Sequence, residues 1–74
     1  MNGYIISSMK SMTHAEKAKR LVDRAGIRSS IVGLDRNLTR HGCAYGLEYS
    51  VSDAPHVRRI LAENGLGYGD VLGG

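Results

Sequence analysis

Residues 13–27 read THAEKAKRLVDRAGI, and their pattern returns at residues 52–66, which read SDAPHVRRILAENGL. In both stretches apolar residues recur at helical spacing, charged residues fall between them, and a glycine follows. The pattern predicts two amphipathic helices that end near Gly26 and Gly65, because glycine readily adopts the left-handed conformation that stops a helix. The shared spacing indicates that both helices pack on the same partner.

The starts of these helices carry capping signals. Thr13 and Glu16 have the spacing of a capping box, in which each side chain accepts a hydrogen bond from the other residue's amide. Ser52 or Asp53 would cap the second helix. Pro55 is tolerated in its first turn, where backbone amides have no partner within the helix.

Short runs of apolar and β-branched residues flank both helices, and they predict strands over residues 4–8, 27–34, 44–51 and 66–72. Each half of the chain then reads strand, helix, strand. Two such halves predict a ferredoxin-like βαββαβ sandwich of the α+β class. In this fold two helices lie on one face of a four-stranded antiparallel sheet. We expect residues 1–74 to form this single domain, because a chain of 74 residues builds one modest core.

The composition of the chain argues against nucleic-acid binding and against a membrane segment. The chain has 10 Lys and Arg against 7 Asp and Glu, and these charges are spread along it. Phe and Trp are absent, so only four tyrosines would stack on bases, and nucleic-acid binding is not favoured. The single cysteine has no intrachain partner, and we find neither a signal peptide nor a long apolar run. We therefore expect a cytoplasmic protein without a membrane segment.

The connection between the second and third predicted strands holds that cysteine, Cys43, beside Gly42 and after Arg40 and His41. In the predicted topology this connection and the start of the first helix lie at the same end of the sheet, which brings His14 nearby. A helix N-terminus and cationic groups favour a thiolate, so Arg40, His14 and His41 are candidates to tune a reactive Cys43. Two interpretations stay open: an exposed nucleophile on a loop, or a small buried residue at the start of a strand.

Metal and cofactor sites are not predicted. His14, His41 and Cys43 are ligand types for zinc, but the close cysteine spacing that is typical of zinc sites is missing. The alternating glycines of residues 65–69 are not a dinucleotide fingerprint, because they follow a helix and open a strand. A carrier protein is therefore favoured over a complete enzyme.

The chain resembles a small bacterial family, the selenium/sulfur carrier-like proteins, over nearly its whole length. The resemblance rests on YIISS at residues 4–8, THAEKA at 13–18, LVDRAGI at 21–27 and RNLTRHGC at 36–43. Asp35, Asn37 and the order Gly42-Cys43 depart from the family's usual pattern. The resemblance implies a ferredoxin-like fold and a role for Cys43 in carrying sulfur or selenium as a persulfide or selenosulfide.

Two functional hypotheses follow. In the first, the chain is a carrier whose Cys43 accepts sulfur or selenium from a donor enzyme and passes it to an acceptor enzyme. In the second, it is a non-catalytic module that binds protein or RNA through the open face of its sheet. Side chains that we expect on that face are Tyr4, Ile6, Tyr45, Tyr49 or Tyr68. A homodimer is compatible with both hypotheses.

Overall fold

The computed structural model of the chain describes residues 3–39, 42–67 and 71–73. Its elements are β1 (Tyr4–Met9), α1 (Met12–Arg24), β2 (Ser29–Gly33), the 3-10 helix η1 (Arg36–Leu38), β3 (Tyr45–Ser50), the 3-10 helix η2 (Val51–Asp53), α2 (Ala54–Glu63) and β4 (Val71–Gly73). Both helices and the first three strands lie where the sequence pattern predicted them. The fourth strand is shorter than predicted at its start, since Leu66 and Gly67 lie outside it and residues 68–70 fall outside the described ranges.

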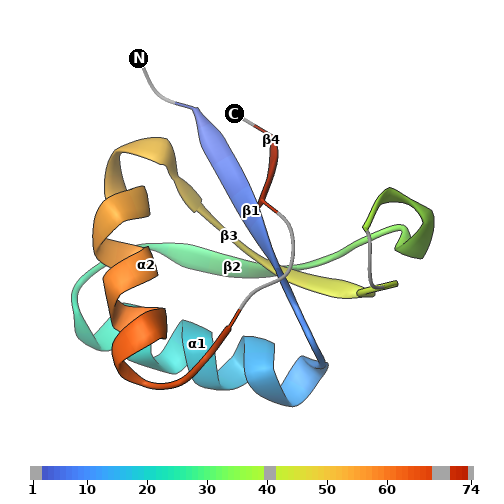
Figure 1. Cartoon of the computed structure of the whole chain (residues 1–74). Helices are drawn as coiled ribbons and strands as arrows, with labels where there is room; N and C mark the ends of the chain where they lie inside the picture. Colours follow the sequence, from blue (N-terminus) through green and yellow to red (C-terminus); the bar gives the residue numbers. More distant parts are fainter. Residues whose placement is uncertain (1–2, 40–41, 68–70, 74) are drawn as a thin grey trace.

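The four strands form one antiparallel sheet in the order β2-β3-β1-β4. β1 pairs with β3 along its length, from Tyr4 opposite Ser50 to Met9 opposite Tyr45. Figure 1 shows α1 and α2 on the same side of this sheet. The prediction of an α+β protein with two helices and a four-stranded antiparallel sheet is therefore confirmed.

The core lies between the sheet and the two helices. Alternation along β1 and β3 turns Ile5, Ser7, Leu47 and Tyr49 toward the helices, where all four are buried. The helices bury small and branched residues at helical spacing against them: Ala15, Ala18 and Val22 from α1, and Val57, Ile60 and Leu61 from α2. This burial stabilises the fold by about 25 cal/mol for each Å² of apolar surface removed from water.

The start of α1 differs from the prediction. The N-cap is Ser11, whose hydroxyl accepts a hydrogen bond from the His14 amide at 3.3 Å. The predicted capping box of Thr13 and Glu16 is wrong, because Thr13 already lies inside the helix. A serine hydroxyl satisfies an amide of the first turn as well as a threonine does, so the two candidates were not distinguishable by residue type.

The other helix ends agree with the prediction. Asp53 is the N-cap residue of α2, although its side chain makes no capping hydrogen bond, and Pro55 lies in the first turn. Gly26 and Gly65 follow the two helices with φ of +79° and +66°. A residue with a Cβ is strained at such angles, and this is why glycine ends both helices.

Within the described ranges, neither helix has the length and apolar character that crossing a membrane requires.

Candidate functional site around Cys43

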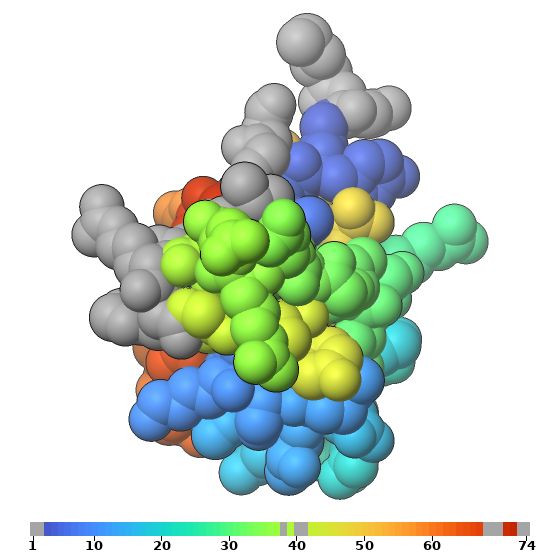
Figure 2. Space-filling view, turned by 90° about the vertical axis from the view of Figure 1, so that its right-hand side faces the viewer, coloured from blue at the N-terminus to red at the C-terminus, as the bar shows by residue number. Residues whose placement is uncertain are grey.

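The connection between β2 and β3 extends past the ends of both strands, at the right of Figure 1. Leu34 extends the β2–β3 pairing, because its amide donates to the Ala44 carbonyl at 2.7 Å. The Asp35 carboxylate then accepts a hydrogen bond from the Asn37 amide at 2.9 Å and so caps η1. Figure 2, which views the molecule from the right-hand side of Figure 1, shows this connection in green near the centre of the view, above the start of α1 in blue. We call residues 34–39 the strap.

Gly46 allows the strap to approach the sheet closely. A Cβ at this position would lie 2.6 Å from Cγ2 of Ile6 and 3.0 Å from Cδ1 of Leu34, so either side chain would have to move. Leu34 therefore packs beside Ile6 over β3. By alternation with Ile5, Ile6 lies on the face that the helices leave uncovered, so this contact is on that face.

Cys43 is buried two residues before β3. The residue keeps 8% of its surface exposed, and its thiol is free. It lies outside the main cluster of core residues between the sheet and the helices. Of the two interpretations drawn from the sequence, the structure agrees with the buried cysteine at the start of a strand. The interpretation of an exposed loop thiol is wrong for this conformation.

Thr39 holds the backbone of Cys43. Its Oγ1 accepts a hydrogen bond from the Cys43 amide at 2.7 Å and lies 3.4 Å from the Cys43 carbonyl oxygen, to which it donates. The same hydroxyl lies 3.3 Å from the Arg36 carbonyl, so its single proton is shared between two acceptors. Thr39 is itself buried. Sequence reasoning missed this contact, because a threonine four residues before a cysteine does not reveal how the turn between them folds.

His14 contacts the N-cap residue of its own helix. It lies half-buried in the first turn of α1, with Nδ1 3.2 Å from Oγ of the N-cap residue Ser11. The pairing of Met9 with Tyr45 does place the start of α1 at the same end of the sheet as the end of the strap. The other two predicted tuning residues, Arg40 and His41, fall outside the described residues. Within the described part of the chain, no three His, Cys, Asp or Glu side chains are arranged to hold a metal ion.

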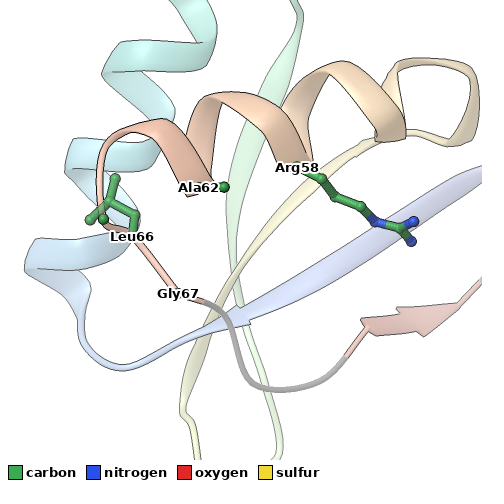
Figure 3. Close-up of a pocket in the computed structure, with 5 residues that line it drawn as sticks. Arg58, Ala62, Leu66 and Gly67 are labelled. Carbon is green, nitrogen blue, oxygen red and sulfur yellow. The ribbon is translucent and has the colours of Figure 1, made fainter.

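Two open grooves lie along α2. The larger, of about 590 Å³, is lined by Arg58, Ala62, Gly65, Leu66 and Gly67. Figure 3 shows Arg58 at one end of it and Leu66 at the other. The second, of about 330 Å³, is lined by Pro55, His56 and Arg59. Neither groove includes Cys43 or a residue of the strap, so neither offers a substrate pocket to the thiol.

The face opposite the helices carries fewer aromatic side chains than the sequence predicted. Tyr4 is 63% exposed there, and Ile6 is half-buried. Tyr49 instead faces the helices and is hydrogen-bonded to Ser7 in the core. Tyr45 shares its side of β3 with Tyr49 by alternation. The placement of Tyr45 and Tyr49 on the open face is therefore wrong, and Tyr68 lies outside the described residues.

No family model matches this sequence, and no curated protein or solved structure is significantly similar to it.

Proposed function

We propose that this chain is a cytoplasmic carrier of sulfur or selenium in which the Cys43 thiol accepts the atom from a donor enzyme and passes it to an acceptor enzyme. The observation that carries the proposal is the pair of hydrogen bonds between the Thr39 hydroxyl and the Cys43 backbone. A buried hydroxyl bonds both backbone groups of the one cysteine, and that cysteine lies outside the main core. A residue that only fills space is positioned by packing, whereas Cys43 is positioned by directional bonds. The resemblance to the selenium/sulfur carrier-like proteins involves the same segment, from Arg36 to Cys43.

We also propose that the fold is of the ferredoxin-like type. The strand order β2-β3-β1-β4 and the sequence of elements support this assignment. In such a fold the β2–β3 connection and the start of α1 share one end of the sheet, as the Met9–Tyr45 pair indicates. A donor that approached this end would meet the strap, Cys43 and the positive end of the α1 dipole together.

The proposed transfer is an exchange at sulfur. The Cys43 thiolate attacks the outer sulfur of the donor's persulfide, the S–S bond of the donor breaks, and the donor leaves as a thiolate. Cys43 then holds the atom as a persulfide until an acceptor thiolate attacks the same outer sulfur and Cys43 leaves as a thiolate. For selenium the outer atom is selenium, and the product is a selenosulfide. Thiolate and persulfide exchange places without net oxidation, so this chemistry requires neither a cofactor nor a pocket for a small substrate.

Uptake can be measured on the intact protein. After incubation with a cysteine desulfurase and cysteine, the wild-type protein is expected to gain the mass of one sulfur atom, and a reductant should remove it. A parallel incubation with a selenocysteine lyase and selenocysteine tests selenium. Cys43→Ser is the matched control, because serine keeps the backbone groups that Thr39 bonds, and it should gain neither atom. A wild-type protein that gains neither contradicts the proposal.

A second candidate function is a protein-interaction module that pairs with another copy of the chain. The observation that favours it is exposed apolar surface at one end of the sheet. Tyr4 is 63% exposed and lies opposite Ser50, the neighbour of Val51, which is 41% exposed. Light scattering should then report a dimer that Tyr4→Ser converts to a monomer. RNA binding is less favoured, because Tyr49 is buried, and it would be recognised by an affinity that falls steeply with salt.

A further inference from the structure

We propose that the free edge of β2 is a pairing site for a second copy of this chain. In this proposal two copies align their β2 strands antiparallel about a two-fold axis at Ile31, and their sheets join into one continuous sheet. The proposal does not depend on the carrier function. It also uses a surface separate from the exposed residues Tyr4 and Val51.

The position of β2 in the sheet leaves one of its sides unpaired. In the order β2-β3-β1-β4 it pairs with β3, and no strand within the described ranges pairs with its other side. The opposite edge of the sheet is β4, which spans three residues, Val71–Gly73, whereas β2 spans five, Ser29–Gly33. The longer edge therefore offers more unpaired backbone groups to another strand.

The hydrogen bonds of β3 show which backbone groups of β2 point to this free edge. The Leu34 amide donates to the Ala44 carbonyl at 2.7 Å, and in the antiparallel register the even-numbered residues of β2 are then the ones bonded to β3. On the other side of β3, the Val51 amide donates to the Gly3 carbonyl at 2.9 Å, so the odd-numbered residues of β3 bond to β1 instead. The backbone groups that point to the free edge are therefore those of Ser29, Ile31 and Gly33.

The sequence of β2 lacks the features that usually protect an edge strand. Such strands commonly carry a charged side chain, a proline or a bulge that prevents a second strand from adding. The sequence SSIVG has no charged residue and no proline, and its register with β3 runs without a break from Ser29 to Gly33. Ile31 and Val32 are half-buried, so an added strand would cover apolar surface that one copy leaves partly in water.

The arrangement of these backbone groups is self-complementary. With the axis at Ile31, the amide and carbonyl of this residue bond the carbonyl and amide of Ile31 in the second copy. Ser29 then lies opposite Gly33 of the second copy, and Gly33 opposite its Ser29. Each of the outward backbone groups obtains a partner in this register, so a second copy of β2 fits the edge along its whole length.

The ends of two strands paired in this way are also complementary in charge. Arg28 precedes β2 and Asp35 follows it, and both are exposed. In the proposed register Arg28 lies opposite Leu34 of the second copy, one residue from its Asp35 and two from its Arg36. Asp35 accepts the Asn37 amide through Oδ1, and among the described residues no contact occupies its Oδ2. The carboxylate can therefore receive the guanidinium of the second copy at both ends of the pair.

A pairing of this size is weak and depends on concentration. Five residues from each copy bury less than the roughly 1,200 Å² at which specific, stable interfaces begin. We expect a dissociation constant on the order of 0.1 mM, so that about four-fifths of the chains are dimeric at about 1 mM and few are at about 10 µM. Analytical ultracentrifugation over this range measures the association. A wild-type protein that is monomeric at about 1 mM overturns the proposal.

Ser29→Pro removes one outward amide without removing a bond to β3. Proline is tolerated at the first residue of an edge strand. Ser29→Ala is the matched control, because it keeps the amide, and the hydroxyl that it removes has no partner among the described residues. Ser29→Pro should weaken association at least about tenfold, since one hydrogen bond is lost from each copy, and Ser29→Ala should stay within about twofold of the wild type. Equal association of the two variants overturns the proposal, and so does a dimer that only Tyr4→Ser abolishes.

Hydrogen exchange of the wild-type protein tests the register without relying on a variant that folds. The amides of Ser30 and Val32 bond to β3 and should be protected at every concentration. The amides of Ser29, Ile31 and Gly33 should exchange rapidly at about 10 µM and about fivefold more slowly at about 1 mM, because only about one-fifth of the chains are then monomeric. Exchange of the Ile31 amide that does not change with concentration overturns the proposal.

Discussion

The Tyr49 phenol and the Ser7 hydroxyl form a hydrogen bond inside the core that the helices cover. The two residues are diagonal neighbours on adjacent strands, since Ser7 lies opposite Leu47 and Tyr49 opposite Ile5. Both side chains are fully or almost fully buried, and each satisfies the other's polar group without water. Tyr49 therefore stabilises the core, and its ring is not accessible to a partner on the open face.

Removing both partners of this hydrogen bond is expected to cost less than the two single removals added together. Tyr49→Phe leaves the Ser7 hydroxyl without its phenol partner and should lower the free energy of unfolding by about 1–3 kcal/mol. Ser7→Ala should cost a similar amount. The double variant should lose less than the sum of the single losses, because no polar group of the pair is then left buried alone. Urea unfolding of the four proteins measures this, and strictly additive losses would show that the hydrogen bond does not couple the two residues.

Gly46→Ala is expected to lower the free energy of unfolding by about 1–3 kcal/mol, because the new methyl group would overlap Ile6 and Leu34. Gly33→Ala in the neighbouring strand is the matched control, since nothing lies within 4 Å of the position of its Cβ. That control should change stability by no more than about 0.5 kcal/mol. Adding Leu34→Ala to Gly46→Ala should relieve the overlap in part. Equal losses for the two glycine variants would rule out close packing of the strap on β3.

Ser11→Ala is expected to lower the free energy of unfolding by about 1 kcal/mol, because the His14 amide at the start of α1 loses its acceptor. Thr13→Ala should be neutral or slightly stabilising, since Thr13 lies inside the helix and alanine is the better helix former. Thermal unfolding of both variants shows which substitution lowers stability more. A larger loss for Thr13→Ala would favour the capping box that the sequence suggested.

Much of the fold could be predicted from the sequence, because local patterns indicate its helices and strands directly. Helical spacing of apolar residues in 13–27 and 52–66 located both helices, and Gly26 and Gly65 located their ends. Alternation in β3 placed Leu47 and Tyr49 on one side of the sheet. These features depend on neighbours in sequence, so no knowledge of the tertiary structure was needed.

The environment of Cys43 was harder to predict from the sequence, because it depends on how the connection between β2 and β3 folds. The close approach of Leu34 to Gly46 becomes visible only in the tertiary structure. The hydrogen bond between the Cys43 amide and Thr39 could likewise not be predicted, because it depends on how the turn between the two residues folds. Gly46, a glycine inside a predicted strand, could have indicated close packing here, because glycine at such a place often marks an approach by another segment.

The measurement that tests the carrier function most directly is delivery of the bound atom to a second thiol. Wild-type protein loaded by a desulfurase, separated from the donor and mixed with a protein that has one accessible cysteine should return to its unloaded mass. The recipient should gain one sulfur atom in the same interval. Loaded protein that keeps its sulfur while the recipient gains none would contradict the account, and so would equal loading and delivery by Cys43→Ser.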